Sequence, residues 1–134
     1  MFRSKITGLG FFVPENIVSN DDLSKLMETS DDWISERTGI KNRRWVGDKK
    51  LTTSLMGTYA AEEAIADAGI DKNDIDFIIF STLSPDYYFP GSGVLLQRNL
   101  GIKEIGALDV RNQCSGFIYG CLLYTSPSPR DLWI

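Results

Sequence analysis

The feature that most constrains the fold is a run of four apolar residues, Phe77 to Phe80, that no polar side chain interrupts. A strand with one face in water alternates apolar and polar residues, so an unbroken run indicates a strand covered on both faces, as in a parallel sheet. A second buried strand is predicted at residues 106–110, and a helix at residues 91–101 separates the two. Strand, helix and strand in this order predict an α/β fold.

Further elements are predicted before this strand–helix–strand run. Residues 4–14 alternate in polarity and turn at Pro14, which predicts a first strand. Helices are predicted at residues 19–29, 30–39 and 52–69. The last of these carries Ala60, Ala64 and Ala68 four residues apart, so one of its faces has only small side chains. We therefore expect that helix to lie close against another element.

Composition excludes several classes of protein. The net charge of −4 gives no basic patch for nucleic acid, and no apolar run approaches the roughly 18 residues that a membrane span needs. The apolar stretch near the N-terminus is too short for a signal peptide and no cleavage site follows it. With two cysteines and no histidine, neither a disulfide framework nor a metal site is expected. We expect a cytoplasmic protein with no nucleic-acid or membrane partner.

The last fourteen residues, CLLYTSPSPRDLWI, break the α/β pattern. Two prolines within three positions end any helix. Residues 121–131 also match one reading frame of a transposase-type sequencing adapter. We interpret residues 121–134 as a non-native tail produced by adapter read-through, and residues 1–120 as the native part. The alternative is a genuine proline-rich tail.

Cys114 is the candidate for chemistry. It follows the strand predicted to end at Val110, and a helix is predicted to begin at Ser115 and Gly116. The unpaired N–H groups and the dipole at a helix N-terminus favour a thiolate and could also stabilise the oxyanion of an attacked thioester. Gly116 leaves the approach to the sulfur open. The alternative is a buried cysteine that only packs, and the usual histidine partner is missing from the chain.

Several separated motifs, in order, resemble the amino-terminal part of a beta-ketoacyl-acyl carrier protein synthase III, a thiolase-like condensing enzyme. They are GLGFFVPENIVSNDDL, TSDDWISERTGIKNRRW, AAEEAIADAGI, FSTLSPDYYFPGSG, LGIKEIGALDV and CSGFIYG. The resemblance covers residues 1–120 and implies that they form the N-terminal half of a condensing-enzyme domain. The implied fold class is α/β, the first half of a layered α/β/α/β/α fold, truncated here, and the implied assembly is a homodimer.

The resemblance also implies a function. Members of this family take an acyl group from acyl-coenzyme A onto a cysteine, here Cys114, and condense it with malonyl-acyl carrier protein as carbon dioxide leaves. Coenzyme A thioester is a substrate, and no cofactor is implied. The family's catalytic histidine and asparagine belong to the second half, so this chain is expected to be inactive alone. The alternatives are a related condensing enzyme that primes polyketide or long-chain ketone synthesis, and a non-catalytic interaction module.

The resemblance assigns further site residues. Trp33 and Arg37 match positions that hold coenzyme A, the indole on adenine and the guanidinium on phosphate, and Thr38 is expected to donate to the same group. The alternative is that Trp33 packs under its helix and Arg37 is solvated. Phe89 matches a position that lines the acyl pocket, often across the dimer interface. Residues 111–113 replace the small residues of acetyl-specific members, which leaves the starter acyl group open.

Two expectations concern surfaces. Lys41, Arg43 and Arg44 form a basic cluster that either meets phosphates or a carrier protein, or is simply solvated. A sheet edge and a helix face intended for the missing half would be exposed in this chain. We therefore expect poor solubility or aggregation.

Overall fold

The structure, a computed structural model, describes residues 5–48, 50–112 and 114–125. The chain divides into two compact units, and each is described by itself. The sheet unit comprises Met1–Phe12 and Thr52–Ile134, and the small unit comprises Val13–Leu51.

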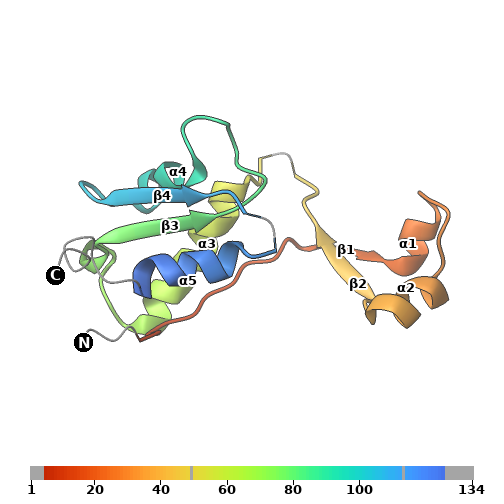
Figure 1. Ribbon diagram of the computed structural model, residues 1–134. Coiled ribbons are helices and arrows are strands. Elements are labelled where there is room, and N and C mark those ends of the chain that lie inside the picture. The colour runs from red at the N-terminus through yellow and green to blue at the C-terminus, as the bar shows by residue number, and fades with distance from the viewer. Residues whose placement is uncertain (1–4, 49, 113, 126–134) are drawn as a thin grey trace. The chain divides into compact units, whose positions relative to one another are not determined.

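A two-stranded parallel sheet forms the centre of the sheet unit (Figure 1). Strand β3 (Phe77–Ser81) pairs with β4 (Gly106–Val110), and Ile78 stands opposite Ala107. Helix α4 (Ser92–Leu100) lies between the two strands in sequence. The predicted strand–helix–strand order and the parallel pairing are both confirmed.

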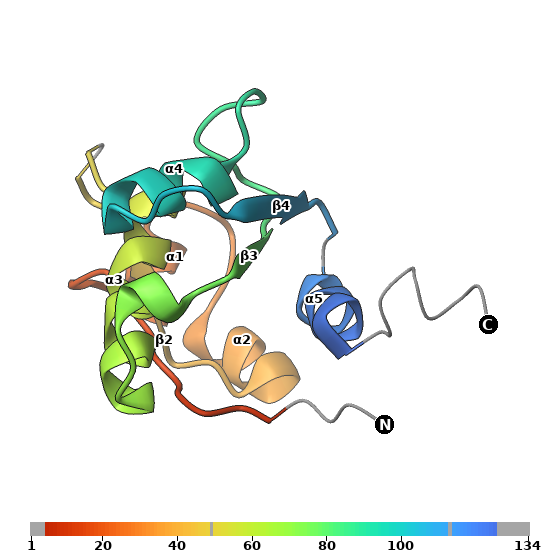
Figure 2. The same ribbon diagram turned by 90° about the vertical axis from the view of Figure 1, so that its left-hand side faces the viewer.

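Helices cover the two faces of this sheet (Figure 2). Helices α3 (Thr53–Ala68) and α4 pack together on one face, and α5 (Gly116–Thr125) lies on the other. The core lies on the α3–α4 side, where buried Ile78 contacts Leu96 and Leu100. Because successive strand residues point to opposite faces, Ser81 faces α5 instead, and its hydroxyl donates to the Gly116 carbonyl at 3.1 Å. The unit is an α/β helix–sheet–helix sandwich.

The prediction that both strands are fully covered is wrong in part. Phe77 is 54% exposed and Leu108 is 41% exposed. The reason is that a single helix, α5, covers the second face, and it approaches β3 through Gly116 and Gly120. These glycines meet β3 at Ser81 and Ile79, which leaves Phe77 and Leu108 uncovered.

The capping residues of the sheet unit explain where its helices end. The Thr52 hydroxyl accepts from the Leu55 N–H and starts α3, and Gly69, at φ 65°, ends it. Gly101, at φ 70°, ends α4 in the same way. A short 3₁₀ helix, η1 (Lys72–Asp74), follows α3. The predicted ends at Gly69 and Gly101 are confirmed.

The first predicted strand is wrong: described residues 5–14 contain no strand. The segment instead runs along α3 as a coil (Figure 1). The Leu9 N–H donates to Asp67 at 2.9 Å, and the Phe11 N–H donates to Glu63 at 2.8 Å. Carboxylates of α3 thus accept hydrogen bonds from alternate N–H groups of this segment. In a sheet, those N–H groups would donate to a neighbouring strand instead. This is why an alternating sequence forms no ladder here.

The small residues of α3 let this segment approach closely. A Cβ on Gly8 would overlap the Ala64 carbonyl and lie 2.7 Å from the Ala68 Cβ, and one on Gly10 would overlap the Ala60 carbonyl. The predicted close approach to the alanine row is therefore confirmed, and its partner is the N-terminal segment.

The small unit contains a two-stranded antiparallel sheet that the sequence does not predict. Strand β1 (Asn16–Ser19) pairs antiparallel with β2 (Asn42–Trp45), with Val18 opposite Arg43. Helices α1 (Asn20–Ser24) and α2 (Asp31–Thr38) connect the strands. Each strand has only four residues and carries polar side chains, so neither shows the apolar pattern by which strands are found.

The predicted helix at residues 19–29 is shorter than expected. Ser19 caps α1 and forms a reciprocal capping box with Asp22, but the helix ends at Ser24. Leu26 and Met27 are 67% and 55% exposed, so these two side chains bury little apolar surface that could stabilise a longer helix. The helix predicted at residues 30–39 is confirmed as α2, with Ser30 as its N-cap and Gly39 at its end.

A buried asparagine holds the small unit together. Asn20 is 1% exposed, and its amide donates to Asp31 at 2.7 Å and to the Ile40 carbonyl at 2.8 Å. Its amide oxygen accepts from Arg43 at 2.6 Å. Arg44 likewise donates to the Pro14 carbonyl at 3.2 Å. These two arginines of the predicted basic cluster therefore bind the unit's own polar groups.

Among the described helices, none combines the length and the apolar character that a membrane crossing requires.

Candidate active site

Cys114 lies in the turn that joins β4 to α5. The first hydrogen bond across this turn runs from the Tyr119 N–H to the Ser115 carbonyl, at 3.0 Å, so the helix begins directly after Ser115. The first N–H groups of any helix lack partners within it, and the dipole places positive potential at that end. The thiol group therefore stands two residues before the start of α5, as predicted.

The Cys114 side chain is exposed. It lines an open cavity of about 460 Å³ in the sheet unit. The other lining residues are Ser81, Thr82, Leu83, Asn112, Gly116 and Phe117. A cysteine that only packs in the core would be buried, and the structure does not show this. The sulfur can be reached by a thioester carbonyl.

Gly116 fixes the start of α5 against the sheet. It is buried, and a Cβ there would lie 3.3 Å from the Ser81 Cβ, closer than side chains normally approach. The Ser81 hydroxyl holds the Gly116 carbonyl at the same point. Gly116 thus lets the N-terminus of α5 meet the end of β3, beside Cys114.

The loop between β3 and α4 is anchored by Asp86, which the sequence reading missed. Its carboxylate accepts from the Ser54 N–H, at 2.8 Å, and from the Ser54 hydroxyl, both near the start of α3. The Asp86 N–H donates to the fully buried Ser92 hydroxyl at 3.1 Å. Burial raises the pKa of Asp86, but hydrogen bonds from Ser54, Thr52 and Ser92 outweigh it and hold the pKa below its usual value.

A second carboxylate anchors the other end of this loop. Gly91, the residue before α4, has no side chain to cap the helix. Asp109 of β4 takes that place and accepts from the Gly93 N–H at 3.1 Å. A Cβ on Gly91 would overlap the Asp109 carboxylate. Glycine at position 91 therefore gives the strand carboxylate access to the helix start.

The tip of this loop carries Tyr88 and Phe89, which are 90% and 91% exposed. Arg111 donates to the Tyr88 carbonyl at 3.0 Å, and its guanidinium carbon lies 5.2 Å from the centre of the Tyr88 ring. Phe89 is not among the described residues that line the Cys114 cavity.

Trp33 and Arg37 contact each other on α2 of the small unit. The Arg37 guanidinium lies 4.5 Å from the centre of the Trp33 ring, and it also donates to the Trp33 carbonyl at 3.4 Å. Trp33 is 53% exposed, so the indole does not pack under its helix. Arg37 also lies 3.6 Å from Glu36, in a solvent-exposed pair. Both predicted coenzyme A residues are thus accessible and adjacent.

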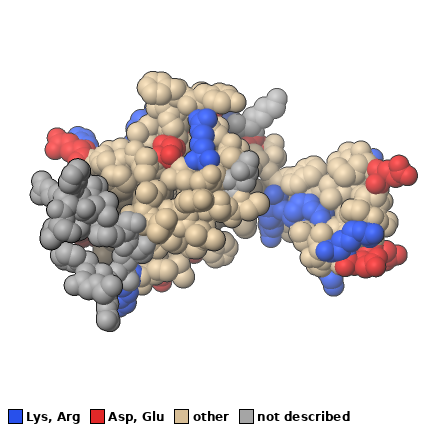
Figure 3. All heavy atoms as spheres, viewed as in Figure 1, with Lys and Arg blue, Asp and Glu red and all other residues tan. Residues whose placement is uncertain are grey.

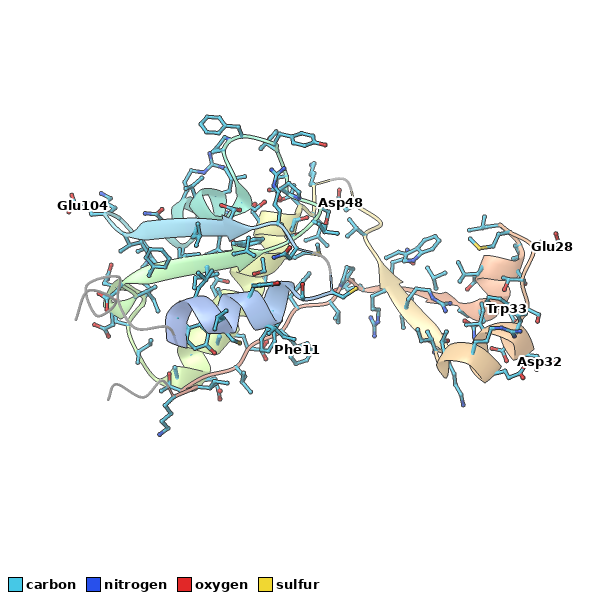
Figure 4. All side chains as sticks on the ribbon, in the orientation of Figure 1. Phe11, Glu28, Asp32, Trp33, Asp48 and Glu104 are labelled. Atoms are coloured by element: carbon cyan, nitrogen blue, oxygen red, sulfur yellow. The ribbon has the colours of Figure 1, made fainter. Side chains whose placement is uncertain are left out.

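Trp33 also lines a cavity of about 480 Å³ within the small unit. The other lining residues are Met27, Glu28, Thr29 and Ser30 (Figure 4 labels Trp33 and Glu28). The Thr38 hydroxyl donates to the Ile34 carbonyl at 2.7 Å and accepts from the Ile40 N–H at 3.1 Å. Its proton is already used, so donation to a ligand would require this bond to break.

Proteins of known family match the chain over most of its length. It is 51% identical, over 118 residues, to a beta-ketoacyl-[acyl-carrier-protein] synthase III of Chlamydia pneumoniae. The matched stretch covers 88% of this chain and 35% of that relative. Over this stretch the chain is similar to part of beta-ketoacyl-[acyl-carrier-protein] synthase III. It spans about a third of the length of the curated relatives that it matches. No family model matches the chain.

Solved structures of the synthase III family share the fold. The structure matches 3-oxoacyl-[acyl-carrier-protein] synthase III from Aquifex aeolicus with a TM-score of 0.85 and 42% identity, over 90% of this chain and 38% of that one. It matches the priming beta-ketosynthase of a polyketide biosynthetic pathway with a TM-score of 0.85 and 29% identity, over 90% of this chain and 36% of that one. The fold is therefore the thiolase-like α/β fold of synthase III, present in part.

The structure groups the predicted synthase III residues by unit. Cys114 and Phe89 belong to the sheet unit, and Trp33, Arg37 and Thr38 belong to the small unit. Among the described residues, no cluster of three or more histidine, cysteine, aspartate or glutamate side chains could hold a metal ion. The residues that sequence reasoning missed are polar anchors, and a carboxylate directly after Pro85 was the available signal for Asp86.

Proposed function

We propose that this chain carries the acyl-accepting cysteine of a beta-ketoacyl-acyl carrier protein synthase III. The observation that supports it is the position of Cys114, exposed in an open cavity two residues before the start of α5. A nucleophile there lies near N–H groups that have no partner within the helix. The same groups are suited to receive the negative charge that develops on a thioester carbonyl oxygen.

The proposed step transfers one acyl group. The Cys114 thiolate attacks the carbonyl carbon of acyl-coenzyme A, and a carbon–sulfur bond forms. The bond from that carbon to the coenzyme A sulfur then breaks, and the coenzyme A thiolate leaves and takes a proton from solvent. The product is a thioester on Cys114 together with free coenzyme A.

We further propose that Trp33 and Arg37 hold the coenzyme A. The exposed indole offers a flat apolar face to adenine, and the guanidinium offers paired donors to phosphate. Their contact at 4.5 Å supports the proposal because it preorganises both side chains for the same ligand. Phe89 is proposed to line the acyl pocket in the homodimer.

The second half of the reaction needs groups that this chain lacks. In the proposed condensation, malonyl-acyl carrier protein loses carbon dioxide, and the resulting enolate carbon attacks the acyl-Cys114 thioester and expels the thiolate. The family resemblance places the histidine and asparagine that stabilise this enolate in the second half, and the chain has no histidine. We expect acylation of Cys114 without condensation, so the chain alone is inactive as a synthase.

The test is acylation followed by intact-mass and peptide mass spectrometry. The chain is incubated with acetyl-coenzyme A, and we expect one acetyl group on Cys114, its absence in Cys114→Ala, and its retention in Cys121→Ser. Equal acylation of both cysteines would show unselective chemistry and contradict the proposal. Slow iodoacetamide labelling of Cys114 that acyl-coenzyme A does not suppress would favour the interaction-module alternative.

A polyketide-priming role is the second candidate. It is favoured by the priming beta-ketosynthase, whose TM-score equals that of the Aquifex synthase. Arg111 and Asn112 also stand where acetyl-specific members have small residues. A panel of acyl-coenzyme A thioesters of increasing length, scored by the mass added to Cys114, distinguishes the two. Preference for acetyl supports fatty-acid initiation, and preference for a longer group supports the second role.

A further inference from the structure

We propose that Ser81 is a positioning residue for the acylation of Cys114, because its hydroxyl fixes the first peptide group of α5 beside the sulfur. The proposal rests on the acylation of Cys114 proposed above. Ser81 is the last residue of β3 and lines the same cavity as Cys114. In this role its hydroxyl contacts the backbone that presents the thiol, and it acts on the substrate only through that backbone.

The first argument is the contact itself. The Ser81 hydroxyl donates to the Gly116 carbonyl at 3.1 Å, and the two residues are 35 positions apart in the sequence. Gly116 is the first residue of α5, and it lines the Cys114 cavity together with Phe117. A hydrogen bond therefore joins the end of β3 to the start of α5 at the wall of that cavity.

The second argument is the backbone freedom of glycine. The peptide group is planar, so the Gly116 carbonyl and the Phe117 N–H turn together and point in opposite directions. Glycine restricts backbone rotation less than any other residue, so Gly116 alone holds this plane only loosely. A hydrogen bond to its carbonyl keeps the plane in the helical orientation, in which the first N–H groups point out of the helix N-terminus. The Phe117 N–H is then directed towards the end of α5 at which Cys114 lies.

The third argument is that the close approach of α5 to β3 and the looseness of the turn have the same origin. A Cβ at position 116 would lie 3.3 Å from the Ser81 Cβ, and a Cβ on Gly120, one turn later, would lie 3.4 Å from the Ser81 hydroxyl oxygen. The small residue that allows the helix to come so near also leaves the turn without a stiffening side chain. The Ser81 hydroxyl offsets this at the same point.

The consequence is a difference between two reactions of the same sulfur. Attack on a thioester places negative charge on the carbonyl oxygen, and an N–H group that is already in position stabilises that charge. Alkylation by iodoacetamide forms a carbon–sulfur bond and expels iodide, and no tetrahedral oxyanion develops. If the peptide between Gly116 and Phe117 loosens, acylation of Cys114 should therefore slow more than its alkylation.

The first part of the test compares Ser81→Thr with Ser81→Val, two variants of nearly the same shape that differ in the hydroxyl. Ser84→Val is the control, at an exposed position that does not line the described cavity. Each protein receives acetyl-coenzyme A, and the rate at which Cys114 gains an acetyl group is followed by mass spectrometry. We expect a rate about fivefold lower in Ser81→Val than in Ser81→Thr, and a rate near that of wild type in Ser84→Val. Equal rates in the two Ser81 variants would overturn the proposal.

The second part distinguishes positioning from a general loss of structure. The rate of Cys114 alkylation by iodoacetamide should differ by less than about twofold between Ser81→Thr and Ser81→Val, because this reaction needs no oxyanion donor. A merely structural role would change alkylation and acylation by the same factor. That result would overturn the proposal.

The third part needs no acylation. The Tyr119 N–H donates to the Ser115 carbonyl at 3.0 Å in the first turn of α5, so its hydrogen exchange reports how firmly the helix start is held. We expect about fivefold faster exchange at Tyr119 in Ser81→Val than in Ser81→Thr. Equal exchange would show that the hydroxyl does not hold the helix start, and the proposal would be wrong.

The three parts also separate this inference from the function on which it rests. If wild type accepts no acyl group, the proposed function fails and the positioning role fails with it, although hydrogen exchange still decides whether Ser81 holds the start of α5. If wild type is acylated and the rate is insensitive to the hydroxyl at position 81, the function stands and this inference alone is wrong.

Discussion

At the scale of single residues, the carboxylates decide the local structure of the sheet unit. Asp86 and Asp109 each accept from an N–H near a helix start, and Gly91 has no side chain that could do so. A carboxylate at the positive end of a helix stabilises both the unpaired N–H and the dipole. The loop that carries Phe89 therefore depends on two acidic side chains that lie outside every predicted site.

Asp86→Asn is predicted to destabilise the sheet unit by about 1 kcal/mol at pH 7, because a charged acceptor is lost in a partly solvated place. The pKa of Asp86 is lowered in the folded chain, so its contribution is present above the unfolded pKa of about 4 and is lost as the pH falls through the folded value. The difference between wild type and Asp86→Asn should therefore shrink below pH 4. Urea unfolding followed by circular dichroism at several pH values measures it.

The matched control for this change is Asp76→Asn, at an exposed position before β3. It should leave the stability unchanged across the same pH range. If the unfolding free energy of Asp86→Asn equals that of wild type at pH 7, the hydrogen bonds that Ser54 and Ser92 make to residue 86 stabilise the fold without the negative charge, and the prediction is wrong.

Single residues also show what the sequence can disclose. Ser30, Thr52, Gly69 and Gly101 mark helix ends by local chemistry, so their roles follow from their neighbours in sequence. Asn20 is different, because its partners Asp31, Ile40 and Arg43 come from three later segments. Contacts of that kind form only when distant segments come together in the folded chain, so no local sequence pattern predicts them.

At the scale of elements, the N-terminal segment shows how a strand-like pattern can be satisfied without a sheet. Its alternate N–H groups meet Asp67 and Glu63 of α3, and its glycines lie against the helix backbone. Sequence periodicity reports which residues share a face, but it does not report whether a neighbouring strand exists. The same limit explains why β1 and β2, which are short and polar, were missed.

Gly8→Ala is predicted to destabilise the sheet unit by about 1–3 kcal/mol, since the added methyl group would overlap the Ala64 carbonyl and force the segment away from α3. Gly120→Ala is the control. A Cβ there would meet only ordinary contacts, at 3.4 Å from Ser81 and 3.7 Å from Ile79, within a helix. Urea unfolding should show a loss for the first variant and no loss for the second. Equal stability of Gly8→Ala and wild type would mean that the segment does not pack as described.

At the scale of the whole molecule, α5 presents a large apolar surface. Its exposed residues include Phe117, Ile118, Tyr119, Leu122 and Leu123. The face of the sheet unit that Figure 3 shows is largely uncharged wherever it is drawn in colour. Exposed apolar patches of this kind drive association in water. The predicted tail begins inside this helix, at Cys121, and its residues 126–134 lie outside the described residues.

The chain is predicted to self-associate through this surface. Sedimentation velocity should show oligomers or aggregates whose proportion rises with concentration, and Ile118→Lys should reduce that proportion at least twofold. Leu26→Lys, at an exposed apolar position of the small unit that is 67% exposed, should change it little. A soluble monomer with a sharp, cooperative melt would contradict the prediction.

The close approach of α5 to the sheet through Gly116 has a consequence for which positions can accept a substitution. A Cβ at position 116 would lie 3.3 Å from the Ser81 Cβ, so a larger residue there requires α5 or β3 to give way by a few tenths of an ångström beside Cys114. The exposed tip of the loop between β3 and α4, at Tyr88 and Phe89, is free of that restriction. Substitutions are therefore expected to be tolerated at the exposed loop tip and to be costly at the turn that presents the thiol.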